Sequence, residues 1–278
     1  MTSSRTPHSL ARPIYVVDAF ADGPFRGNPA AVVPLEPGDE PGAEWMQTVA
    51  AEMQHSAPAY VQPRAAGGFD LRWFTPEVEV DLCGHATLAS AHVLYETSRL
   101  HFDTEAVFHT RGGELRATRQ LDGAVQLDFP ATPPEPCDAP AGLLDALGIA
   151  KAESLCTTGA FFMLVVPDAA TVRDLAPDFH ALRDLTDVRG VYVTAAGDNG
   201  THDIVSRCFA PKVGIDEDPV TGSMHCVLAP YWCERLDTVN LHAHQASARG
   251  GAMHVHLAGD RALLVGRAIT VLQGELLA

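Results

Sequence analysis

The sequence contains an internal repeat, and this repeat constrains the fold more than any other feature. Arg72 begins an Arg-x-Phe-x-Pro element that is followed by an acidic stretch and by Gly84. Arg207 begins a second such element, which is followed by another acidic stretch and by Gly222. The two arginines and the two glycines are separated by nearly the same number of residues. Matching patterns in this order indicate duplication of one structural unit. The alternative is two strand–turn–helix units that are alike by chance.

A proline-rich segment separates the two repeats. Residues 129–136 (FPATPPEP) include four prolines, and another follows at position 140. Proline lacks a backbone N–H and interrupts helices and central strands. We therefore predict a tail at residues 1–13, a first half at 14–129, a linker at 130–140 and a second half at 141–278, whose last strand could pack on the first half.

Each repeat has the same predicted local structure. Extended segments at residues 71–74 and 205–209 each lead into a turn, after which Gly84 or Gly222 opens a helix. Further strands are predicted at residues 14–17, 161–166 and 190–194, and further helices at 44–53 and 143–147. A helix start has unpaired N–H groups and the positive end of the helix dipole, so it attracts a carboxylate. Two such starts that face each other would hold one small anionic substrate from both sides.

Composition narrows the classes of function. The 278 residues carry a formal net charge of −16 with only 19 Lys and Arg, which argues against binding to nucleic-acid phosphates. No stretch approaches the roughly 18 apolar residues of a membrane helix, and the tail has no apolar segment typical of a signal peptide. The six cysteines show no Cys-x-x-Cys spacing, which argues against a disulfide scaffold or a zinc cluster. We therefore expect a soluble cytoplasmic protein in a reducing setting, with no nucleic-acid or membrane partner.

Short motifs in a fixed order give the chain a family resemblance. They are residues 18–20 (DAF), 27–32 (GNPAAV), 72–76 (RWFTP), 83–87 (CGHAT), 217–223 (EDPVTGS), 245–251 (QASARGG) and 266–275. The chain resembles the phenazine-biosynthesis (PhzF-like) isomerase family over residues 14–275. The resemblance implies an α+β fold of the diaminopimelate-epimerase type, in which two similar domains each wrap a curved, mostly antiparallel β-sheet (a half-barrel) around a central helix, with the active site between them. It also implies a homodimer that uses no metal and no organic cofactor.

The resemblance further implies the residues of the active site. His85, Asp218 and Ser223 correspond to family residues that position the substrate and assist proton transfer. Histidine titrates near neutrality and burial tunes a carboxylate, so these residue types suit acid/base chemistry. The simpler alternative for each is a helix cap or a turn former. The residues implied to contact the substrate are Asn28, Ser56, Gly84, Thr221, Gly222, Arg249 and Gly250.

The chain departs from the family at the main acid/base residue. The family has a glutamate in a Ser-Glu-Thr element, whereas Ala57 occupies that place here, after His55 and Ser56. A methyl group cannot carry a proton, so three explanations are open. Asp218, His85 or His55 has taken over the role; the reaction needs only an easier proton shift, as in a pyrroline-carboxylate intermediate; or the protein binds a ligand without catalysis. The sequence favours a cofactor-independent isomerase that moves a proton or double bond on a small carboxylate, in secondary or amino-acid-derived metabolism.

Thiol chemistry is the main enzymatic rival. Cys83 precedes Gly84 at a predicted helix start, an environment that lowers the pKa of a thiol. An epimerase or dehydratase could therefore use Cys83. The opposing position is Thr221 rather than a second cysteine, which leaves only a one-thiol mechanism.

Metal chemistry is the weaker rival. His242 and His244, like His254 and His256, alternate along predicted extended segments, so each pair shares one face. The sequence places no third ligand beside them. We therefore expect no metal site.

Overall fold

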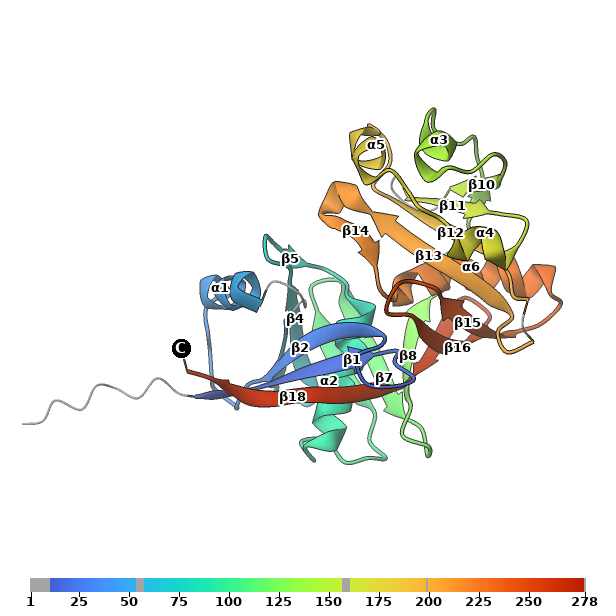
Figure 1. Cartoon of the computed structure of the whole chain (residues 1–278). Helices are drawn as coiled ribbons and strands as arrows, with labels where there is room; N and C mark the ends of the chain where they lie inside the picture. Colours follow the sequence, from blue (N-terminus) through green and yellow to red (C-terminus); the bar gives the residue numbers. More distant parts are fainter. Residues whose placement is uncertain (1–10, 54–57, 157–160, 199, 278) are drawn as a thin grey trace, which may run out of the picture.

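The computed structural model describes residues 11–53, 58–156, 161–198 and 200–277 (Figure 1). His55, Ser56 and Ala57 lie outside the described residues, as does the predicted tail up to residue 10. The chain forms two lobes, each a curved sheet around one central helix. No helix in these ranges is long and apolar enough to cross a membrane.

The first lobe surrounds a helix that is buried on nearly all sides. Its elements are β1 (Arg12–Ala19), β2 (Asn28–Pro34), α1 (Ala43–Met53), β3 (Ala59–Pro63), β4 (Phe69–Phe74), β5 (Glu79–Val80), α2 (Gly84–Glu96), β6 (Ala106–Thr110), β7 (Gly113–Arg119) and β8 (Val125–Pro130). Strands pair antiparallel except for β2–β3 and β4–β6, which are parallel. Apolar residues occupy most of α2, which is why the sheet can wrap it.

The second lobe repeats this arrangement. Its elements are α3 (Leu143–Leu147), β10 (Glu153–Cys156), β11 (Phe161–Val165), α4 (Ala169–Arg173), α5 (Phe179–Asp184), β12 (Gly190–Ala196), β13 (Ile204–Ala210), the 3-10 helix η1 (Pro211–Val213), β14 (Ile215–Asp218), α6 (Gly222–Arg235), β15 (Asn240–Gln245), β16 (Gly251–Ala258) and β17 (Arg261–Gly266). β11–β12 and β13–β15 are parallel, and the other pairs are antiparallel. Strand for strand, this matches the first lobe, with α6 in the place of α2. The predicted duplication is therefore confirmed by the topology.

Strands cross between the lobes in three places. β8 pairs antiparallel with β17, which makes the sheets continuous. The chain then exchanges strands: β9 (Glu135–Pro136) follows the first lobe and pairs with β10, while β18 (Ala268–Leu276) follows the second lobe and pairs with β1 along its whole length. In β9 the proline, Pro136, is the last residue of the strand, as expected of a residue that has no N–H to donate. Part of the proline-rich segment is thus sheet.

The predicted elements are found close to their predicted bounds. The strands at residues 14–17, 161–166 and 190–194 fall in β1, β11 and β12, and the helices at 44–53 and 143–147 are α1 and α3. The sequence did not predict any disulfide, whereas Cys137 is disulfide-bonded. Cys83, Cys208, Cys226 and Cys233 are free thiols.

Phe20 fills the junction between the lobes. It follows β1, is fully buried, and has a positive φ of 57°. A Cβ placed on Gly222 would lie 3.5 Å from its ring, and one on Gly266 would lie 2.4 Å from it. The ring thus packs against the start of α6 and the end of β17. Two second-lobe glycines make room for one first-lobe aromatic side chain.

Candidate functional site

The starts of α2 and α6 meet at the junction of the lobes. A Cβ placed on Gly84 would lie 3.6 Å from Gly222 Cα and 3.8 Å from Ser223 N. The residues that cap these starts, Cys83 and Thr221, are extended, and neither side chain accepts a hydrogen bond from its helix. The first-turn N–H groups of both helices therefore face a shared space without a side-chain cap. This is the arrangement that attracts an anion.

Asp218 lies at the end of β14, beside this space. Asn28 Nδ2 donates to Asp218 Oδ1 at 2.8 Å and to the Val220 carbonyl at 2.8 Å. Thr221 Oγ1 donates to Asp218 Oδ2 at 2.5 Å. Burial raises the pKa of Asp218, and the nearby His85 charge and these two donors offset part of the rise. Asp218 is therefore a partly desolvated carboxyl group held in one orientation.

His85 is the second residue of α2 and faces two acidic groups. Its Nδ1 lies 3.6 Å from Cys83 Sγ, and its Nε2 lies 3.8 Å from the same atom. Burial alone lowers the pKa of His85, but the interactions with Cys83 and with Asp218 outweigh burial and raise this pKa to about 9. At neutral pH the imidazole is consequently protonated. His85 and Asp218 are thus two buried titratable groups, one from each lobe, whose charges interact.

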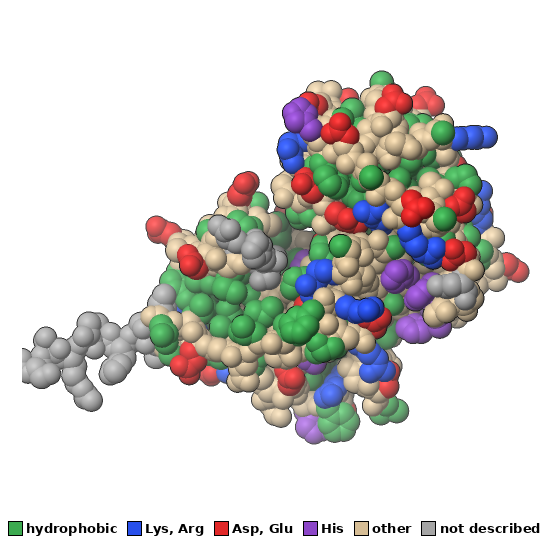
Figure 2. All heavy atoms as spheres, viewed as in Figure 1, with side chains coloured by type: hydrophobic (Ala, Val, Ile, Leu, Met, Phe, Trp, Pro, Cys, Tyr) green, Lys and Arg blue, Asp and Glu red, His purple; other side chains and the backbone are tan. Residues whose placement is uncertain are grey.

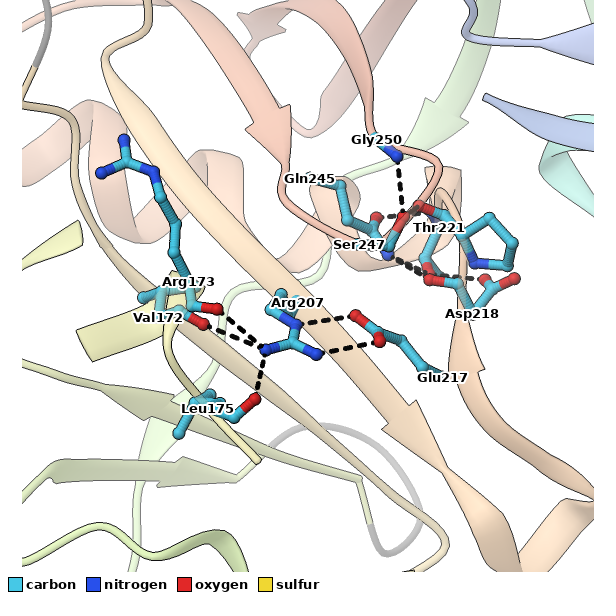
Figure 3. A network of polar contacts seen from close by, with 11 residues as sticks. Val172, Arg173, Leu175, Arg207, Glu217, Asp218, Thr221, Gln245, Ser247 and Gly250 are labelled. Carbon is cyan, nitrogen blue, oxygen red and sulfur yellow. Dashed lines mark hydrogen bonds and ion pairs between the residues drawn. The ribbon is translucent and has the colours of Figure 1, made fainter. Parts of the chain in front are cut away.

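A network in the second lobe holds Asp218 in place (Figure 3). Thr221 N donates to Gln245 Oε1 at 2.6 Å, and Gln245 Nε2 donates to the Asp218 carbonyl at 2.7 Å. On the other side, Arg207 Nε and Nη2 bind the Glu217 carboxylate at 2.7 and 2.9 Å. Arg207 Nη1 also donates to the Leu175 carbonyl at 2.7 Å. The residue that precedes Asp218 is thus fixed by a two-point ion pair.

The arginine of the first repeat makes the same contact in its own lobe. Arg72 Nε and Nη2 bind the Glu79 carboxylate at 2.7 and 2.9 Å. The repeated Arg-x-Phe-x-Pro element therefore has a structural explanation, because in each lobe the arginine ties a long strand to the short strand that leads to the helix start.

Arg249 and Gly250 contact protein atoms next to the site. Arg249 Nη2 donates to the buried Asp18 carboxylate at 2.7 Å, and Arg249 Nε donates to the Gly27 carbonyl at 2.8 Å. The Gly250 carbonyl accepts from Gly27 N at 2.7 Å. These bonds fasten the loop that leads into Asn28 to the second lobe. Arg249 and Gly250 thus contact the loop before Asn28, and their contact with a substrate stays a prediction.

The structure brings most of the sequence-predicted residues together. They are Asn28, Cys83, Gly84, His85, Asp218, Thr221, Gly222 and Ser223. Ser223 is exposed at the helix start. Ser56 and His55 lie outside the described residues. The sequence did not predict Gln245 or Asp18 as site residues. Both belong to the motifs described above, and the structure shows that both side chains are buried.

Four histidines of the second lobe lie in two pairs, and Figure 2 shows a group of histidines on the surface of the molecule. The ring of His242 lies 4.0 Å from that of His254, centroid to centroid, and His202 stacks on His244 at 4.8 Å. Burial is the first cause that lowers the pKa of His202, His244 and His254. Among the described residues no group of three or more His, Cys, Asp or Glu side chains could hold a metal ion.

Comparison with known families identifies the chain. The PhzC-PhzF model, described as phenazine biosynthesis-like protein, matches residues 17–274. The chain belongs to this family. A Pseudomonas aeruginosa protein named as an uncharacterized isomerase is 49% identical over 265 residues, which cover 95% of this chain and 98% of that one. A Halalkalibacterium halodurans protein with the same kind of name is 43% identical over 269 residues, which cover 96% and 99%.

A solved structure gives the same result for the fold. The crystal structure of a PhzF-family protein from Enterococcus faecalis is 40% identical, with a TM-score of 0.89, and the match covers 96% of this chain and 99% of that one. The family resemblance and the predicted α+β fold are confirmed. The PhzC-PhzF family places the chain among isomerase-like proteins.

Proposed function

We propose that the chain is a cofactor-independent isomerase that moves a proton, and with it a double bond or a configuration, on a small carboxylate-bearing substrate. The observation that supports this most is the acid–base pair of His85 and Asp218 beside two uncapped helix starts. The relatives named as isomerases agree with this class of reaction. The pair also explains how a proton could be moved without the family glutamate. Ala57 cannot carry a proton, whereas His85 and Asp218 both can.

The mechanism follows from the positions of these groups. The substrate carboxylate accepts hydrogen bonds from first-turn N–H groups of α2 and α6 and from Ser223 Oγ. The Asp218 carboxylate takes a proton from the carbon next to the substrate carboxylate, and the C–H electron pair is delocalised towards that carboxylate, where the helix starts stabilise the added negative charge. The His85 imidazolium then gives its proton to a carbon of the delocalised system. After product leaves, Asp218 releases its proton to solvent and His85 takes one up from solvent, so both groups are restored and proton count and charge balance.

An activated substrate lowers the demand on this pair. A pyrroline-carboxylate or another cyclic imine or enamine from amino-acid-derived metabolism has acidified C–H bonds. Asp218 can therefore serve as the base for such a substrate although the family glutamate is absent. We therefore place such compounds first among the substrates to be tested.

Solvent-deuterium exchange tests the proposal. We expect deuterium to enter such carboxylates in the presence of the wild-type protein, and Asp218→Asn to slow this by about two to four orders of magnitude, the usual scale of general acid/base catalysis. Asp216→Asn is the matched control, since Asp216 lies on the same short strand, is exposed and pairs with Arg183. Binding of the carboxylates without any exchange would replace this proposal by a ligand-binding function.

A one-thiol mechanism is the second candidate, because Cys83 Sγ lies 3.6 Å from His85 Nδ1 at a helix start. In that case Cys83, rather than Asp218, would take the proton. Loss of exchange after thiol alkylation, reproduced in full by Cys83→Ala, would favour this candidate.

A further inference from the structure

A cavity of about 450 Å³ opens next to the two helix starts. Gly84 and Ser223 line one part of it. Residues of α6 and of the strands β11 and β12 line much of the rest. Its walls are largely apolar, from side chains that include Phe129, Tyr192 and Val227. Its volume is in the range of small-molecule sites, roughly 300–1,000 Å³. The cavity therefore extends from the proposed carboxylate site into the second lobe.

Arg189 is the charged residue of this cavity. It precedes β12 and is exposed, and its guanidinium lies 5.7 Å from the centre of the Phe161 ring. It forms no ion pair with any carboxylate of the described residues, whereas the neighbouring Arg183 pairs with Asp216 at 3.0 Å. In a chain with 35 acidic and 19 basic residues, a cation without a carboxylate partner at a cavity is a site for an outside anion.

Aromatic rings hold the guanidinium at the cavity. Phe161 lies beneath Arg189, and Tyr192 stacks on Phe161 with ring centres 5.5 Å apart and planes 24° apart. Arginine stacks on such faces while its N–H groups stay directed at an acceptor in the plane of the guanidinium. This leaves two parallel donors for the two oxygens of a carboxylate.

We propose that Arg189 binds a second carboxylate of the substrate, so that the enzyme acts on small dicarboxylates with an apolar middle. The inference rests on the proposed function, in which the first carboxylate lies at the helix starts. The apolar walls then contact the carbon skeleton, and Arg189 raises the affinity for compounds that carry a second carboxylate. Arg189 is a specificity-determining residue and takes no part in proton transfer.

Binding of simple diacids tests the subsite directly. The probes are glutarate, adipate and pimelate, each compared by calorimetry at neutral pH with its monomethyl ester, which has the same skeleton and one charge fewer. We expect at least one diacid to bind wild-type protein about tenfold or more tightly than its ester, as for a charge-assisted two-point contact. Arg189→Gln should remove this preference and leave the affinity for the ester within about twofold, and Arg189→Lys should restore part of it.

Controls separate this inference from the proposed function. Arg183→Gln removes the same charge nearby and should keep the preference for the diacid. Ser223→Ala should weaken diacid and ester alike, because Ser223 belongs to the first carboxylate site. A wild-type protein that shows no preference, or binds none of the probes at millimolar concentration, overturns the subsite, as does a preference that survives Arg189→Gln. If deuterium exchange persists in any of those cases, the proposed isomerase function is retained and only the subsite is rejected. If the protein prefers diacids but catalyses no exchange, only the isomerase function is rejected.

Discussion

His85 shows how neighbouring groups shift the pKa of a buried imidazole. Its ordinary pKa is near 6.5, and burial alone would lower it, so an isolated imidazole at this place would be neutral. The interactions with Cys83 and Asp218 reverse this and raise the pKa of His85 to about 9. Because the folded pKa lies above the unfolded one, the stabilisation is present in full below about pH 6.5 and is lost as the pH rises through about 9.

Replacing this thiol gives a prediction at the residue scale. We expect the exchange rate of the wild-type protein to fall on the alkaline side near pH 9, where His85 loses its proton, and on the acidic side as Asp218 becomes protonated. In Cys83→Ala the alkaline limb should move to lower pH, because only Asp218 then opposes burial, while activity at the optimum persists. The pH profiles of kcat/KM for both proteins check this. An unmoved alkaline limb would show that Cys83 does not set the charge of His85.

At the scale of elements, the start of α6 packs against a residue that belongs to neither central helix. Phe20 follows β1, and its ring packs between the start of α6 and the end of β17. The ring is fully buried and also lies among the side chains of the main core, which includes Leu88 of α2. It therefore cannot move aside cheaply to admit a larger neighbour.

Two glycines near the C-terminus make this testable. A Cβ at Gly266 would lie 2.4 Å from the Phe20 ring and 3.2 Å from Leu88, so Gly266→Ala should destabilise the protein by about 1–3 kcal/mol, as overpacking of a core does. Gly274→Ala is the control, because its nearest neighbours would lie at 3.9 Å. Urea denaturation measures both. Equal midpoints for the two variants would mean that the junction yields to an added methyl group.

At the scale of the whole molecule, neither lobe is complete without the other. β1 takes its antiparallel partner β18 from the end of the chain, β10 takes β9 from the first lobe, and β8 and β17 join the sheets. The Asp18–Arg249 pair adds a contact between the lobes with one buried carboxylate. The acid–base pair also spans the lobes, so the site exists only when both are folded against each other.

We therefore expect the lobes to unfold together. Slow amide hydrogens of β3 in the first lobe and β12 in the second should exchange through one global opening with the same free energy, as in a single cooperative unit. Native-state hydrogen exchange over a series of denaturant concentrations measures this. Two separate free energies, with one lobe opening while the other stays protected, would contradict it.

The sequence by itself determined the duplicated fold and much of the site. The repeated Arg-x-Phe-x-Pro elements and the glycines that open α2 and α6 are local signals, and His85, Asp218 and Ser223 sit at fixed offsets from them. Tertiary structure alone decided how these starts meet, because that depends on strands exchanged across the whole chain. It also decided that Arg249 binds Asp18, that Cys83 lies beside His85 and that Arg189, among the described residues, has no carboxylate partner at its cavity. Such partners come from distant segments, and no local pattern records which charges the fold will bring together.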